Sequence, residues 1–151
     1  MKLAEALQER ADLNRKIEQL QDRLNNNVLV QEGEQTAEDP KKLKYELDSS
    51  ILRLADLIAH INQTNCTTIV EGQTLTALIA KKDTLSLKIR LYKEITSTAS
   101  QTSYRARNTE IKIKSTISVA DWQAEIDRMA RELRLLDNQL PQSNWSTDLV
   151  E

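Results

Sequence analysis

The chain has 151 residues, of which 39% are hydrophobic and 3% aromatic, and it contains no phenylalanine. Its 21 basic and 23 acidic residues give a formal net charge of −2, so its overall charge does not attract nucleic acid or anionic lipid. Two glycines and two prolines are too few for the turns of a sheet-rich fold, and we expect a mainly α-helical single domain over 1–151 with a narrow aliphatic core.

The first helix is expected over about 2–27, where apolar residues recur at the spacing of a coiled coil. Asn25, Asn26 and Asn27 favour its end. A segment that could be extended, Val28–Val30, and an acidic loop over 31–39 follow. The expected buried positions are Leu3, Ala6, Leu13, Ile17, Leu20 and Leu24.

The second helix is expected over about 40–64, with Asp39 as its N-cap and Pro40 at its first position. Residues 62–73 are rich in Asn, Thr and Gln, and we interpret them as a connection between helices. The expected buried seam is Leu47, Ile51, Leu54, Ile58, Ile61 and Asn65.

The third helix is expected over about 75–98 after Thr74 as N-cap. Ile79, Leu91 and Ile95 widen its apolar face, which indicates contact with more than one neighbour. Its expected seam is Leu75, Leu78, Lys82, Leu85, Ile89 and Tyr92.

Residues 111–117 alternate between apolar and polar side chains, with β-branched residues, which is typical of a strand. A lone strand needs a partner, and the candidates are Val28–Val30 or the same segment of another subunit.

The fourth helix is expected over about 119–140, capped by Ser118 and ended by Pro141. Its expected seam is Trp122, Ile126, Met129, Leu133, Leu136 and Leu140.

Four helices of similar length with short connections predict long antiparallel coiled-coil hairpins, packed as a four-helix bundle. The alternative is two splayed hairpins, each completing its core with another subunit. The narrow seams predict a homo-oligomer in either case.

Six segments along nearly the whole chain also carry a resemblance to a known family. In order they are AEALQERADL, VQEGEQTAEDP, INQTN, GQTLTALIAKKD, TEIKIKST and NWSTDLVE. Together they resemble the septicolysin-like family of small bacterial helical proteins. The resemblance implies an elongated, oligomeric helical protein of undetermined biochemical role, and the family name implies a pore-forming cytolysin.

No catalytic, metal or cofactor site is expected. His60 and Cys66 are the main candidate metal ligands, whereas zinc needs three or four. The chain has no glycine-rich phosphate loop and no visible partner that would orient His60 as a base. An N-terminus without an uninterrupted apolar stretch, one cysteine and no spanning segment predict a cytoplasmic protein.

Two surfaces are candidates for binding. The first, a set of amides and hydroxyls beside a tryptophan, could bind a small ligand or a partner, although such residues more commonly cap helices. The second, a basic patch, could bind phosphate or nucleic acid, or it could pair with the acidic loop over 31–39. The first consists of Asn62, Thr64, Asn65, Thr74, Thr76 and Trp145, and the second of Arg105, Arg107, Lys112 and Lys114.

The first functional hypothesis is therefore a structural or interaction protein that assembles through its helical seams. The alternatives are an accessory protein that binds nucleic acid through the basic patch, and the cytolysin that the family name implies.

Overall fold

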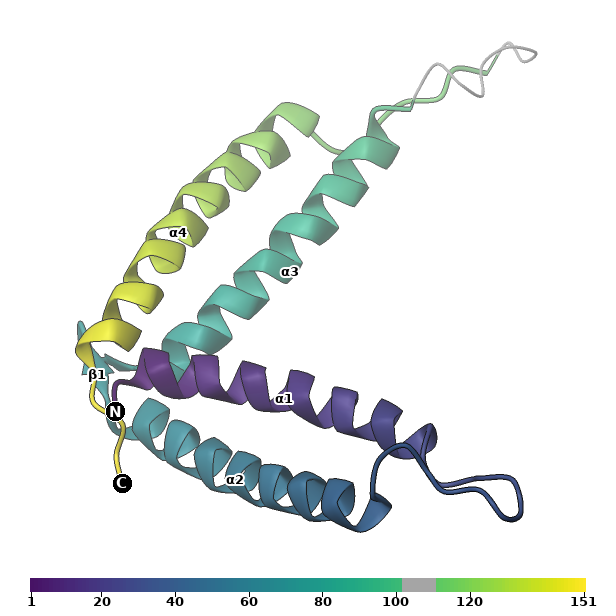
Figure 1. Cartoon of the computed structure of the whole chain (residues 1–151). Coiled ribbons are helices and arrows are strands. Elements are labelled where there is room, and N and C mark those ends of the chain that lie inside the picture. The colour runs from purple at the N-terminus through teal and green to yellow at the C-terminus, as the bar shows by residue number, and fades with distance from the viewer. Residues whose placement is uncertain (102–110) are drawn as a thin grey trace. The chain divides into compact units, whose positions relative to one another are not determined.

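The computed structural model describes residues 1–101 and 111–151, and it is mainly α-helical, as predicted. Figure 1 shows the order of its elements. They are α1 (Leu3–Asn25), α2 (Pro40–Thr67), β1 (Ile69–Val70), β2 (Gln73–Thr74), α3 (Leu75–Ala99) and α4 (Val119–Ser146). The chain divides into two compact units, Met1–Thr74 with Ser143–Glu151 and Leu75–Gln142. The single domain expected from chain length stays a prediction.

In the first unit, α1 and α2 pack side by side as a helical hairpin (Figure 1). The N-cap of α2 is as predicted, because the Asp39 carboxylate accepts a hydrogen bond of 3.0 Å from the Lys41 N–H and Pro40 occupies the first position. The aliphatic side chains buried in this unit are Leu3, Ala6, Leu20, Leu43, Leu57 and Ile61.

The predicted seam of α2 was partly wrong. Ile51 and Ile58 are 47% and 39% exposed, whereas Ser50 and Leu57 are buried. Both sets repeat at spacings of three and four residues, so periodicity alone could not decide which set faces α1. The positions that are buried or half-buried along this seam are Leu43, Leu47, Ser50, Leu54, Leu57, Ile61 and Thr64.

The loop after α1 is fixed by a buried amide. The Asn27 side chain donates to the Arg23 carbonyl at 2.7 Å and accepts from the Glu38 N–H at 2.9 Å. Arg23 also forms an ion pair with Glu38, and the hydrogen bond from Arg23 holds the pKa of that carboxyl below its ordinary value. Val28–Val30 is exposed and forms no strand, contrary to one predicted pairing.

A short β-hairpin links α2 to α3, where only a connection was predicted. Ile69 pairs with Thr74 and Val70 with Gln73. Glu71 and Gly72, with φ of 49° and 81°, form the turn, and two consecutive positive φ angles suit a tight hairpin. Residues 111–117, where a strand was predicted, form no strand within the chain, and their pairing with the same segment of another subunit stays a prediction.

In the second unit, α3 and α4 pack through the predicted seams, with Ile89, Ile126 and Met129 buried. The rings of Tyr92 and Trp122 lie 4.8 Å apart between centroids. Two ion pairs tie the same helices together, Lys81 to Glu132 at 2.8 Å and Lys82 to Asp137 at 3.0 Å.

Pro141 was predicted to end the last helix, yet α4 continues through it to Ser146. A proline inside a helix costs one backbone hydrogen bond and some strain. Packing of the helix end offsets this cost, because Leu140 and Ser143 are buried on either side of the proline.

Candidate functional site

The two ends of the chain pair with one another in the first unit. The Leu3 N–H donates to the Thr147 carbonyl at 2.9 Å, and the Leu149 N–H donates to the Met1 carbonyl at 2.8 Å. Between these bonds, Lys2 and Asp148 form an ion pair of 2.7 Å. The hydrogen bond from Lys2 lowers the pKa of Asp148. We call this pairing of 1–3 with 147–150 the terminal clasp.

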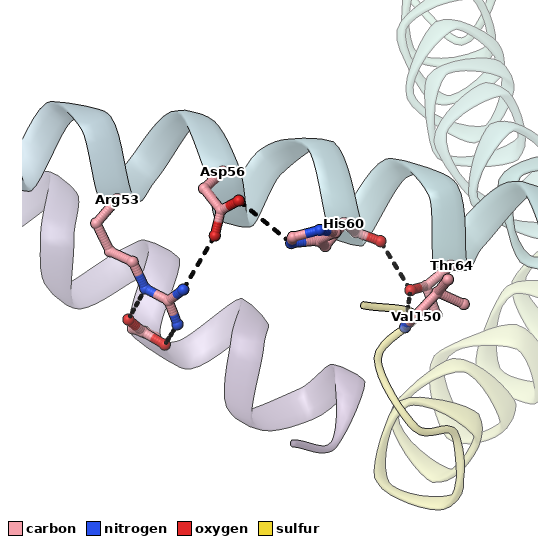
Figure 2. A network of polar contacts seen from close by, with 6 residues as sticks. Arg53, Asp56, His60, Thr64 and Val150 are labelled. Atoms are coloured by element: carbon pink, nitrogen blue, oxygen red, sulfur yellow. Dashed lines mark hydrogen bonds and ion pairs between the residues drawn. The ribbon is translucent and has the colours of Figure 1, made fainter.

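Thr64 fastens the terminal clasp to α2. Its side chain is fully buried, its hydroxyl donates to the His60 carbonyl at 2.7 Å, and the same oxygen accepts from the Val150 N–H at 2.9 Å (Figure 2). The Asn/Thr segment therefore meets the C-terminal tail, and Thr64 is the residue that makes the contact.

A polar network runs along the same hairpin and is drawn in Figure 2. Arg53 on α2 donates to both carboxylate oxygens of Glu9 on α1, at 2.7 and 2.9 Å, and to Asp56 at 3.1 Å. The hydrogen bond from Arg53 lowers the pKa of Glu9, and the same bond raises the pKa of Arg53. Next along α2, the His60 Nδ1 lies 3.6 Å from Asp56.

A hydroxyl, an imidazole and a carboxylate thus lie near one another, and these are residue types that nucleophilic catalysis uses. The Thr64 proton, however, points to the backbone carbonyl of His60 and not to its imidazole. The imidazole faces Asp56 instead. This geometry gives Thr64 a structural role in holding the tail. Within 1–101 and 111–151, no group of three or more His, Cys, Asp or Glu side chains could hold a metal ion.

The rest of the candidate amide and hydroxyl surface is spread over several elements. Asn62 is exposed and Asn65 half-buried on α2, Thr74 belongs to β2, and Thr76 is exposed in the first turn of α3. Trp145 is 57% exposed near the end of α4. A ligand site formed by these residues stays a prediction.

Of the candidate basic patch, Arg105 and Arg107 lie outside the described residues. Lys112 and Lys114 are exposed. Lys114 lines a groove of about 510 Å³ at the C-terminal end of α3, together with Ile95, Thr98, Ile113 and Ile117. The groove is therefore partly aliphatic rather than a purely basic surface.

The face of α3 away from α4 carries a second apolar repeat. Leu87, Leu91 and Ile95 are 45%, 41% and 44% exposed. Together with smaller exposed side chains they recur every three or four residues, and no charged residue occupies these positions. We call this set the α3 outer stripe: Ala80, Thr84, Leu87, Leu91, Ile95 and Thr98.

A comparable face occurs on α2 over its C-terminal half. Arg53 and Asp56 turn toward the polar network, so that the opposite face between Ser49 and Cys66 carries no charge. Leu52 on this face is 73% exposed. The α2 outer stripe consists of Ile51, Leu52, Ala55, Ile58 and Ala59. Sequence reasoning missed it because Ile51 and Ile58 were assigned to the buried seam.

Comparison with known proteins gives two matches. Residues 10–149 match a family described as "Family of unknown function (DUF6847)". The fold resembles the crystal structure of a functionally unknown conserved protein from Corynebacterium diphtheriae, with 34% sequence identity over 99% of each chain and a TM-score of 0.89. No curated protein matches the chain.

Neither match carries the septicolysin-like name, so that resemblance and the cytolysin hypothesis are not supported. Among the described helices, none is both long enough and apolar enough to cross a membrane.

Proposed function

Because the chain belongs to the DUF6847 family of unknown function, its role has to be inferred from its own surfaces, and we propose that it is a cytoplasmic structural protein that self-associates through exposed helix faces. The proposal assigns the chain no catalytic chemistry.

The α3 outer stripe is the observation that carries the proposal. Isolated exposed leucines are common on protein surfaces, whereas a contiguous apolar patch marks a contact. This stripe repeats with the spacing by which one helix packs into another. Between Ala80 and Leu91 it carries no charge, and Glu94, one heptad after Leu87, pairs with Arg90 at 3.7 Å. Burying each half-exposed leucine or isoleucine contributes about 1 kcal/mol.

Helices α1 and α4 show that such a stripe is not a general property of this chain. Apart from Ala11, the outward positions of α1 are polar or charged, so α1 presents no second apolar repeat. They are Glu5, Gln8, Asp12, Asn14, Arg15, Lys16, Glu18 and Gln19. On α4, Leu135 is 69% exposed but stands alone among charged neighbours such as Arg131, Arg134 and Asp137. Each unit thus has one helix with a polar exterior and one, α2 or α3, with an apolar stripe on its exterior.

The test is the mass of the full chain at micromolar concentration, measured by size-exclusion chromatography with light scattering. We expect a mass of at least twice 17.3 kDa. Leu91→Lys should shift the protein to the monomer, since it places a charge in the centre of the stripe. Leu135→Lys is the matched control, because it replaces an exposed leucine outside the stripe and should leave the mass unchanged.

Circular dichroism of both variants should match the wild type, which separates lost association from unfolding. A wild-type chain that remains monomeric at these concentrations would refute the proposal.

A further inference from the structure

The loop between α1 and α2 presents three consecutive aliphatic side chains to solvent (Figure 1). Val28, Leu29 and Val30 are all exposed, and Leu29 is 86% exposed. A run of exposed apolar residues costs solubility, and it is expected only where the run has a function. We call Val28–Val30 the aliphatic loop.

Hydrogen bonds on both sides hold the aliphatic loop in place. Before it, the buried Asn27 amide bonds to the Arg23 carbonyl and the Glu38 N–H, at 2.7 and 2.9 Å. After it, the Gln31 carbonyl accepts a hydrogen bond of 3.0 Å from the Glu34 N–H. A segment whose ends are fixed before binding loses less conformational entropy when a partner buries it. The aliphatic loop is therefore suited to insertion into a groove.

The groove at the C-terminal end of α3 has a complementary lining. Its volume is about 510 Å³, and its aliphatic residues are Ile95, Ile113 and Ile117. Ile95 and Ile113 remain exposed, so the described part of the second unit does not cover them. A groove of this size is large enough to take several aliphatic side chains.

The charges beside the loop and the groove are opposite. Glu32 and Glu34 follow the aliphatic loop, and both are exposed and form no ion pair with any described residue. Lys114 lines the groove and Lys112 lies two residues before it, both exposed and likewise unpaired within 1–101 and 111–151. Opposite charges around an apolar contact favour the correct partner and orientation.

One carboxylate also lines the groove, and its charge is partly offset. The Glu94 carboxylate lies 3.7 Å from the Arg90 guanidinium on the same helix. The two lysines at the groove therefore remain available for an acidic partner.

From these observations we infer that the groove at the end of α3 binds the aliphatic loop of a second copy, with Glu32 and Glu34 beside Lys112 and Lys114. The inference rests on the proposed self-association and adds an interface between two different surfaces. Ile95 belongs to both the groove and the α3 outer stripe, so this interface continues the stripe.

A charge in the aliphatic loop tests its burial. Leu29→Asp should raise the dissociation constant of self-association by at least about tenfold, because a leucine side chain buried in the groove becomes a desolvated carboxylate. Leu135→Asp is the matched control, since it makes the same change at an exposed leucine of α4 and should leave the constant unchanged. Sedimentation velocity over a concentration series measures both constants, and circular dichroism checks that both variants fold.

Charge exchange tests the proposed ion pairs between copies. One variant carries Glu32→Lys with Glu34→Lys, and the other carries Lys112→Glu with Lys114→Glu. Each alone brings like charges together, and its association should weaken about fivefold at low salt. In an equimolar mixture, either loop meets a groove of opposite charge in the other variant, and association should recover to within about twofold of the wild type.

Disulfide trapping tests whether the loop binds its own chain or a second copy. In a background with Cys66→Ser, a chain with both Leu29→Cys and Ile113→Cys is oxidised mildly. We expect disulfide-linked dimers and larger species on a non-reducing gel. The control replaces Ile113→Cys with Leu135→Cys, an exposed position on α4 outside the groove, and should give few linked species.

The outcomes separate this inference from the proposed function. If the wild-type chain self-associates but Leu29→Asp has no more effect than its control, the loop does not bind the groove while self-association stands. The same holds if the charge variants do not recover on mixing, or if the disulfide forms within one chain. If the wild-type chain is monomeric, both fail.

Discussion

The buried hydroxyl of Thr64 accepts a 2.9 Å hydrogen bond from the backbone N–H of Val150, which lies 86 residues further along the chain. The same hydroxyl donates to the His60 carbonyl one turn earlier on α2. The Thr64 side chain therefore makes one hydrogen bond within α2 and one that holds the C-terminal tail.

Replacing Thr64 with valine tests this role. The change keeps the shape of the side chain but removes a donor and an acceptor and leaves the Val150 N–H without this partner, so we expect the free energy of unfolding to fall by about 1 to 3 kcal/mol. Urea denaturation measures it. Thr67→Val is the control, because Thr67 is exposed and its hydroxyl also donates to a carbonyl one turn back, at 2.9 Å. An equal loss in both variants would contradict a special role of Thr64.

The ion pair between Glu9 and Arg53 predicts part of the acid sensitivity of the first unit. Hydrogen bonding by Arg53 holds the pKa of Glu9 below its ordinary value of 4.5. The stabilisation is therefore fully present above pH 4.5 and is lost as the pH falls through the lowered pKa of the folded state. Because the pair is partly exposed, its contribution is below about 1 kcal/mol.

Glu9→Gln should reduce the dependence of stability on pH below 4.5, as measured by urea denaturation at a series of pH values. Glu18→Gln is the control on the same helix, since Glu18 is exposed and makes no ion pair within the described residues. Equal effects of the two substitutions would show that the Arg53 contact does not matter.

The positive φ angles in the turn of the β-hairpin predict different effects on stability for two substitutions. Gly72→Ala should destabilise by about 1 kcal/mol, because φ is 81° and alanine is strained there although a Cβ would meet no atom within 4 Å. Glu71→Gly should be neutral or stabilising, since φ of 49° already strains a residue with a Cβ. Melting temperatures of the two variants give the comparison. A stabilised Gly72→Ala variant would contradict the geometry.

The nucleic-acid alternative is tested by heparin or RNA retention at two salt concentrations. With a net charge of −2 we expect little retention even at low salt. Strong retention that falls steeply with salt, and that is lost when Lys112 and Lys114 are both replaced by alanine, would favour this alternative instead.

The sequence predicted the helices well because their signals are local. Asp39 with Pro40 and Ser118 mark helix starts by chemistry that needs no distant partner. The failures concern contacts. Both stripes on α2 have the same period, and only the position of α1 decides that Leu57 is inside and Ile58 outside. Pro141 looked like a helix end because the burial of Ser143 beyond it cannot be read from neighbouring residues.

In the candidate surfaces, too, local features could be predicted from the sequence and contacts between distant residues could not. Thr64 could be selected as one polar residue of an Asn/Thr-rich segment, but its partner Val150 lies at the far end of the chain, and no periodicity links the two. The α3 outer stripe was predicted only in part, since Ile79, Leu91 and Ile95 were expected to widen the apolar face of this helix, and of these Leu91 and Ile95 belong to the stripe.

The bond between the Leu149 N–H and the Met1 carbonyl also has a practical consequence for protein engineering. Because 1–3 and 147–150 lie against each other, a short linker could join them, and the chain could be reopened in the exposed loop near Gly33. Such a circular permutant should keep both helical hairpins. Conversely, a bulky fusion at either end would compete with the backbone bonds there, so an internal label in that loop would perturb the native structure less.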